Sequence, residues 1–131
     1  MVLHGVGVRI LADSVPVLYD FYTQKLGFRA VWGDRNSSYV AFAEAEIDKP
    51  ALAVFARSGM GEYTHYVPMH GRGDNAVFCT GAQDVDAMYR HLSSKGVRFL
   101  GEPRNIPGWD MRCVYFRDPE GNLFEIAGEM K

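Results

Sequence analysis

The chain lacks the features that mark nucleic-acid-binding, membrane and exported proteins. Its 131 residues contain no basic run longer than two, and the formal net charge is −2. Nucleic acids and anionic membranes are bound by clustered Lys and Arg, so neither is an expected partner. No apolar run approaches the roughly 18 residues of a transmembrane helix, and no charged segment precedes an apolar one at the start. We therefore expect neither a membrane span nor a signal peptide.

Cysteine is also scarce. Cys79 and Cys113 lie in apolar runs, with no Cys-x-x-Cys spacing and no neighbouring cluster of histidines. Such cysteines are usually buried, reduced thiols, which indicates a cytoplasmic protein without disulfides. Hydrophobic residues make up 47% and charged residues 23% of the chain, which is ordinary for a globular domain.

A β-hairpin is predicted near the C-terminus, within Trp109–Ile126. Two apolar runs flank Asp118-Pro119-Glu120-Gly121, in which Pro119 presets a turn, Asp118 can cap it and Gly121 tolerates positive φ. Side chains alternate along a strand, so Glu125 faces away from Phe124 and Ile126. This carboxylate is either an exposed edge residue or part of a cavity lining.

The predicted elements repeat in the order β-α-β-β-β. The first half has a strand at Val6–Ala12, a helix capped by Ser14 and ended by Gly27, and strands at Phe28–Trp32, Tyr39–Ala43 and Ala51–Arg57. The second half has a strand at Asn75–Cys79, a helix capped by Asp84 and ended by Gly96, a strand at Val97–Leu100 and the hairpin. Shifting the chain by about seventy positions aligns the two helices and their caps.

The repeat divides the single domain, 1–131, into a first module at 1–58, a linker at 59–73 and a second module at 74–131. Each module alone is small for a hydrophobic core, so we expect the two to bury their sheets against one another or against a partner chain. The linker Gly59–Gly73 carries methionines, tyrosines and histidines but no periodic pattern. A lid over a cavity and a dimer contact are both open interpretations of it.

Two motifs carry a resemblance to a known family. Asp20–Phe28 (DFYTQKLGF) and Tyr115–Ile126 (YFRDPEGNLFEI), in this order within two βαβββ halves, resemble the vicinal oxygen chelate superfamily of glyoxalases, bleomycin-resistance proteins and extradiol dioxygenases. The resemblance covers nearly the whole chain outside the linker. It implies an α+β fold in which the modules form open curved sheets with helices on the convex side, usually paired in a homodimer.

The resemblance also gives a test for a metal site. Enzymes of the family place a divalent metal on the concave face, with ligands from the first and fourth strands of each half. Only Glu125 occupies such a position; the first-strand histidine position falls on Gly7, and Asn75 is a poor candidate in the second half. His4 lies three residues from Gly7 and is predicted to face the other way. We therefore expect no metal and no other cofactor, although completion of a site by a linker histidine, His65 or His70, stays open.

A cation from the chain is the expected substitute for the metal. By the same alignment Arg9 shares the face of Gly7, and we predict that it pairs with Glu125, since a half-buried carboxylate without a partner is costly. The alternative is that both charges are solvated at a cavity mouth. The alternation of side chains along the strands predicts a ligand-binding face rich in aromatic and sulfur-containing residues. The alternative is that the aromatic residues only fill the core between the modules. The predicted binding residues are Arg9, Trp32, Tyr39, Phe55, Trp109, Met111, Cys113, Tyr115 and Glu125.

The leading functional prediction is a metal-free protein of the bleomycin-resistance type that binds a drug-like or secondary-metabolite molecule. A net charge of −2 is weak for steering a strongly cationic ligand. The alternative is a lyase, isomerase or dioxygenase of the same superfamily, either metal-dependent or with Tyr115 or Glu125 as acid or base. A third interpretation is a non-catalytic dimeric partner protein.

Overall fold

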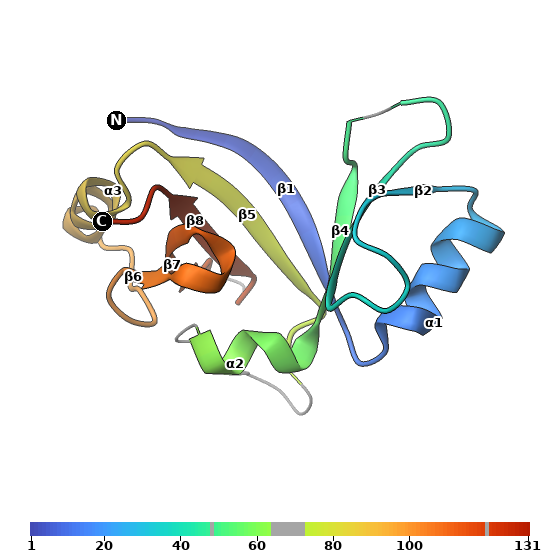
Figure 1. Ribbon diagram of the computed structural model, residues 1–131. Helices are drawn as coiled ribbons and strands as arrows, with labels where there is room; N and C mark the ends of the chain where they lie inside the picture. The colour runs from blue at the N-terminus through green and yellow to red at the C-terminus, as the bar shows by residue number, and fades with distance from the viewer. Residues whose placement is uncertain (48, 64–72, 120) are drawn as a thin grey trace.

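The protein folds into one curved sheet of eight strands, in the order β2-β3-β4-β1-β5-β8-β7-β6 (Figure 1). The computed structural model describes residues 1–47, 49–63, 73–119 and 121–131. In chain order its elements are β1 (Leu3–Ala12), α1 (Val15–Asp20), a π-helical turn (Phe21–Lys25), β2 (Arg29–Trp32), β3 (Tyr39–Ala43), β4 (Leu52–Ala56), a 3₁₀ turn (Arg57–Gly59), α2 (Met60–Tyr63), β5 (Ala76–Ala82), α3 (Val85–Ser94), β6 (Arg104–Ile106), a second 3₁₀ turn (Pro107–Trp109), β7 (Met111–Arg117) and β8 (Leu123–Gly128).

Two βαβββ units meet edge to edge in this sheet, as Figure 1 shows in the strands β1 and β5 running side by side through its middle. The α+β fold expected from the sequence is confirmed. In each unit the first strand pairs in parallel with the fourth, β1 with β4 and β5 with β8. The antiparallel pairing of β1 with β5 joins the units, with Gly7 opposite Cys79. The units therefore share one continuous sheet within a single chain.

The predicted caps and the predicted turn are present. The Ser14 side chain accepts a hydrogen bond from the Val17 amide at 3.4 Å, and the Asp84 side chain accepts one from Ala87 at 3.0 Å. The Asp118 carboxylate likewise accepts from the Asn122 amide at 2.9 Å, which closes the turn of the C-terminal hairpin. These contacts satisfy backbone donors that no regular element pairs.

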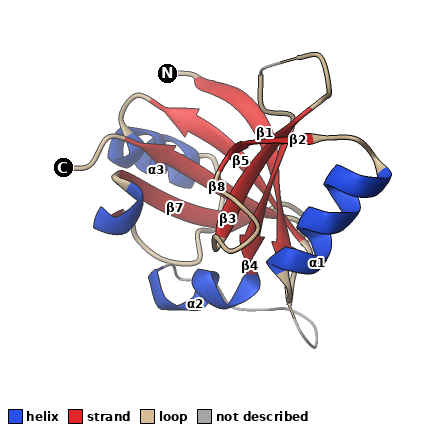
Figure 2. Cartoon of the chain, turned by 45° about the vertical axis from the view of Figure 1, so that its right-hand side comes forward, coloured by secondary structure: helices blue, strands red, loops and turns tan. Residues whose placement is uncertain are grey.

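Helices α1 and α3 cover the convex face of the sheet. Helix α1 packs on β3 and β4, and α3 packs on β7 and β8 (Figure 2), so each unit has an apolar layer of its own on the convex side. The concave face holds a third apolar cluster that draws on both units: Leu11, Phe55, Met60, Val77, Ile106, Cys113, Tyr115 and Leu123. No helix within the described residues is long and apolar enough to cross a membrane.

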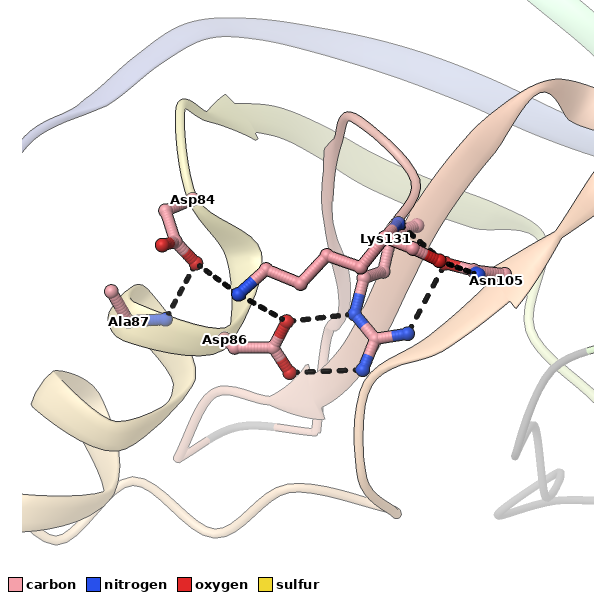
Figure 3. Close-up of polar contacts among 6 residues, drawn as sticks. Asp84, Asp86, Ala87, Asn105 and Lys131 are labelled. Atoms are coloured by element: carbon pink, nitrogen blue, oxygen red, sulfur yellow. Dashed lines mark hydrogen bonds and ion pairs between the residues drawn. The ribbon is translucent and has the colours of Figure 1, made fainter.

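A polar cluster fixes β6 and β7 against the start of α3 (Figure 3). Arg112 on β7 makes a bidentate contact with Asp86, at 2.8 and 2.9 Å, and its third nitrogen donates to the Asn105 side chain at 3.2 Å. Lys131 contacts Asp84 and Asp86 at 3.5 and 3.3 Å through its ammonium group, and its backbone bonds the Asn105 amide group. The cluster holds the strand that leads into the turn carrying Trp109.

The junction of the two units is held at one end by Arg57. Its guanidinium donates to the Leu11 carbonyl at 3.1 Å, at the end of β1, and to the Asn75 side chain at 3.3 Å, just before β5. It also contacts the Asp13 carboxylate at 2.8 Å and the Asp74 carbonyl. One side chain thus ties the ends of β1, β4 and β5 together.

Three sequence-based predictions need correction. Val97–Leu100 is not a strand, because it forms only a single bridge, between Phe99 and Phe116. The Phe99 ring packs edge to face on Tyr89 of α3. The sixth strand is instead the short segment Arg104–Ile106. The segment from Gly59 is not structureless, because Met60–Tyr63 form α2 and Met60 is fully buried. Residues 64–72 of the predicted lid, with His65 and His70, lie outside the described residues.

The third correction concerns Trp109, which strand alternation places on the hairpin strand. It lies instead in the 3₁₀ turn before β7, and Asp110 follows it in the left-handed region at φ 53°. The reversal at Pro107-Gly108 breaks the strand alternation there. Trp109 still packs against the concave cluster.

Candidate functional site

A buried ion pair occupies the concave face. Arg9 on β1 reaches across β5 to Glu125 on β8, with Nη2 to Oε2 at 2.8 Å and Nη1 to Oε1 at 3.4 Å. Arg9 is 7% exposed and Glu125 only 2%. The predicted pairing of these two residues is therefore confirmed. The two strands are not neighbours in the sheet, since β5 lies between them.

Tyr115 completes the surroundings of this carboxylate. It lies directly opposite Glu125 in the β7–β8 ladder, and its hydroxyl donates to Glu125 Oε2. Burial, and then the nearby negative charge of Glu125, raise the pKa of the Tyr115 phenol well above its usual range. The phenol therefore remains protonated and acts as a donor, so that Glu125 accepts from Tyr115 and Arg9 together.

The guanidinium of Arg9 is enclosed by aromatic and sulfur-bearing side chains. Its Cζ lies 5.6 Å from the ring centroid of Phe55 and 5.4 Å from that of Trp109, and Nη2 lies 3.7 Å from the sulfur of Met60. Burial alone would lower the pKa of Arg9, but the pairing with Glu125 raises it overall, so the guanidinium stays charged. Its Nε is buried and has no acceptor among the described residues.

Above the ion pair lies a cavity of about 720 Å³, which we call the aromatic hollow. Six predicted binding residues line it: Arg9, Trp32, Tyr39, Phe55, Trp109 and Met111. Cys113 and Tyr115 instead belong to the buried core below it, at 1% and 3% exposure. Residues that the sequence reasoning missed also contribute: Ser38, Ile106, Pro107 and Gly108. The Pro-Gly pair was a recognisable turn signal for one of these walls.

A second cavity of about 570 Å³, which we call the trough, lies over the middle of the concave face. Its lining includes His4, Gly7, Cys79 and Glu125. Arg9, Tyr39 and Met111 line both cavities, so the trough adjoins the aromatic hollow. The two cavities form a continuous concavity around Arg9.

His4 lies on the concave face, contrary to the prediction from strand alternation. The ladder of β1 with β5 shifts register between His4 and Val6, where Gly5 has a φ of 68°. This bulge adds one residue and restores His4 to the face of Gly7. The His4 ring covers Gly81, at which a Cβ would lie only 2.7 Å from His4 Cε1.

The donor set on the concave face does not fit a divalent metal ion. The described residues contain no group of three or more His, Cys, Asp or Glu side chains that could hold one. Both oxygens of Glu125 are engaged by Arg9 and Tyr115, and Gly7 offers no side chain. Burial, followed by the charge of Glu125, raises the pKa of the neighbouring Cys79 to about 12, so this thiol is protonated at neutral pH. The cation beside Glu125, the carboxylate that the family resemblance gives as a metal ligand, is therefore Arg9 of the chain itself.

The Cys79 thiol is accordingly expected to react slowly. At pH 8 we expect iodoacetamide to modify Cys79 at least about tenfold more slowly than a free cysteine, with a rate that still rises past about pH 10. The measurement is mass spectrometry of the modified peptide over a pH series, with urea-unfolded protein as the control that reacts fully. A rate that levels off near pH 9 would contradict the buried, protonated state.

Comparison of the sequence with known proteins finds a matching family and a relative of similar length. The model of the Glyoxalase/Bleomycin resistance protein/Dioxygenase superfamily matches residues 6–126. The uncharacterized protein YraH of Bacillus subtilis (strain 168) is 27% identical over 122 residues, covering 91% of this chain and 93% of YraH.

Solved structures show the same architecture at lower identity. A superfamily member from Vibrio splendidus 12B01 has a TM-score of 0.63 at 15% identity, covering 98% of this chain and 100% of the other. A variant of the Streptomyces coelicolor methylmalonyl-CoA epimerase, in complex with 2-nitronate-propionyl-CoA, has a TM-score of 0.62 at 16% identity, covering 99% and 100%. At such identity these likenesses show the fold alone.

Proposed function

We propose that this chain, which belongs to the glyoxalase/bleomycin resistance protein/dioxygenase superfamily, binds a small molecule without a metal. The reason is that an internal ion pair engages Glu125, the carboxylate that the family resemblance gives as a metal ligand. The proposed ligand is a neutral, flat and largely apolar compound of the drug-like or secondary-metabolite kind. A homodimer, suggested by the family resemblance, and a cytoplasmic location, suggested by the two unpaired cysteines, are part of the same proposal.

The charge balance at the floor of the aromatic hollow is the observation that carries this proposal. Among the described residues that line the hollow, Arg9 is the charged one, and Glu125 neutralises it at 2.8 Å. An anionic ligand would have to compete with Glu125 for the guanidinium, and a cationic ligand would meet Arg9 itself. A neutral ligand avoids both penalties.

The walls of the hollow support a flat apolar ligand. Its volume of about 720 Å³ suits a drug-sized molecule, and Trp32, Tyr39, Phe55 and Trp109 present aromatic surface from both units. Trp32 is 69% exposed, which is unusual for so large an apolar side chain. Stacking on a ligand would bury this surface and contribute to binding.

Tryptophan fluorescence can detect binding in the aromatic hollow, because the chain has only two tryptophans, Trp32 and Trp109, and both line it. We expect the neutral dye N-phenyl-1-naphthylamine to quench tryptophan emission with one site per chain. Its sulfonated relative 1-anilinonaphthalene-8-sulfonate should bind at least about fivefold more weakly, since Glu125 already neutralises the arginine that the sulfonate would meet.

Trp32→Phe and Trp109→Phe serve as matched variants that keep an aromatic ring. Each should lose part of the quenching while dye emission still reports binding. Tighter binding of the sulfonate than of the neutral dye would contradict the proposed charge balance. Unchanged tryptophan emission with both dyes would contradict the placement of the site.

Acid–base catalysis by Tyr115 or Glu125 is the competing proposal. A general acid or base must come within hydrogen-bond reach of its substrate. Both groups are at most 3% exposed, and they are bonded to each other and, through Glu125, to Arg9. The geometry therefore supports binding better than catalysis. A reaction that Tyr115→Phe abolishes without weakening dye binding would favour the enzymatic alternative.

A further inference from the structure

The trough has a floor of small residues drawn from neighbouring strands. Ala41 of β3 pairs with Ala53 of β4, and Gly7 of β1 pairs with Cys79 of β5. Gly81 of β5 pairs with Ala127 of β8 in the same way. Apart from Gly81, which the His4 ring covers, larger side chains at these positions would fill the trough, so its depth comes from the absence of side-chain volume. A Cβ at Gly7 would meet no atom within 4 Å.

Arg9 has hydrogen-bonding capacity that the described residues do not use. Nη2 contacts both Glu125 and the Met60 sulfur, but Nη1 makes only one contact, at 3.4 Å. Nε makes none within the described part of the chain. A buried donor without an acceptor costs about 1–3 kcal/mol, and Arg9, at 7% exposure, lines the trough as well as the aromatic hollow.

The chemistry of the missing acceptor follows from the charge of its surroundings. Glu125 already neutralises Arg9 and itself lines the trough, so a second carboxylate or phosphate there would face an uncompensated repulsion. A carbonyl oxygen accepts a hydrogen bond without adding charge. The floor of small residues and the unused donors thus suit an uncharged group that bears such an oxygen.

We infer that the trough is a second compartment of the binding site. It receives an arm of the ligand that carries a ketone, ester or amide carbonyl, which Arg9 recognises, while the flat body of the ligand lies in the aromatic hollow. This inference rests on the proposed function. It adds the shape of the ligand and the carbonyl group that Arg9 binds. In this inference Arg9 selects the ligand through its N–H hydrogen-bond donors. Its charge does not select the ligand, because Glu125 already neutralises it.

Two dyes of matched aromatic body test the inference. The probes are 2-(dimethylamino)naphthalene and its 6-propionyl derivative, which adds a short arm ending in a ketone. We expect the ketone dye to bind about tenfold more tightly to the wild-type protein, since one added hydrogen bond to a charged donor has roughly that effect. Binding is measured by dye emission and tryptophan quenching.

Gly7→Leu fills the trough without touching the aromatic hollow. The open space at Gly7 and the ordinary strand geometry there make this variant compatible with folding. It should reduce the affinity for the ketone dye to that for the dye without an arm, and leave the latter dye unaffected. Gly61→Ala is the matched control, because Gly61 is exposed on α2, has equal space for a methyl group and lines neither cavity. It should change neither affinity.

The double variant Arg9→Met/Glu125→Leu removes the donors while keeping the site filled. It should abolish the preference for the ketone dye and retain binding of the dye without an arm. Equal wild-type affinities for the two dyes, or an equal loss of both in Gly7→Leu, would overturn the inference and leave the proposed function standing. Failure of both dyes to bind the wild-type protein would overturn the two proposals together.

Discussion

Glu125→Leu is expected to lower the free energy of unfolding by about 3–5 kcal/mol, because it leaves a buried guanidinium without its partner. Arg9 is 7% exposed and bonds both oxygens of Glu125. Tyr115 loses its acceptor in the same variant. Urea denaturation monitored by tryptophan emission measures the change, and Glu125→Gln, which keeps the side-chain shape and an acceptor oxygen, separates the loss of charge from the loss of volume.

The loss should not decline as the pH is raised from about 7 to 9. Since Glu125 raises the pKa of Arg9 in the folded protein, the contribution of the pair through Arg9 is fully present below the ordinary pKa of an unfolded arginine and declines only at higher pH. An arginine cannot shed its proton to escape an apolar site in this range.

The double variant Arg9→Met/Glu125→Leu is the decisive companion. Replacement of a whole buried ion pair by apolar side chains of similar volume is often neutral or stabilising. We therefore expect it to recover most of the stability lost in Glu125→Leu. A double variant as unstable as the single one would show that the pair is needed for packing and not only for charge compensation.

The second large effect concerns metal binding, which we expect to appear when Gly7→His and Arg9→Ala are combined. The new imidazole would share its face with His4 and lie beside Cys79, whose other neighbour is Glu125. Removal of Arg9 frees Oε1 of this carboxylate, while Tyr115 still donates to Oε2. Imidazole and carboxylate together suit ions such as Zn²⁺ and Ni²⁺. Isothermal titration should then find one ion per chain, and the melting temperature should rise with metal concentration.

Gly7→His alone is the matched control. It adds the imidazole in the open space at Gly7 but leaves Arg9 bound to Glu125, so stoichiometric binding is not expected. Equal affinity in the single and the double variant would show that Arg9 does not block the site. Absence of binding in the double variant would show that the spacing of these strands, and not the arginine, prevents metal coordination.

The parts of the site that follow from alternation along one strand were predictable. Glu125 and Tyr115 face each other because the Asp118 turn sets the hairpin register, and this register can be read from the sequence. The pairing of Arg9 with Glu125 was also within reach, since it required only that both residues face the concave side.

The errors arose where one residue changes the alternation. Gly5 places His4 on the concave face through a bulge, and the glycine within an apolar strand was the only sequence signal for it. Trp109 likewise left its predicted strand because a tight turn precedes β7. The floor of the trough was beyond prediction, because it depends on the registers between several strands and not on any one segment.

The junction of β1 and β5 has a mechanical consequence. The two walls of the aromatic hollow come from different units, Tyr39 and Phe55 from the first and Trp109 and Met111 from the second. Arg57 clamps the junction near Leu11, whereas the opposite end carries the bulge at Gly5. The two walls are therefore joined both through the pairing of β1 with β5 and through the edge-to-face contact of Phe55 with Trp109, whose ring centroids lie 5.5 Å apart. A molecule bound between them would contact both units at once.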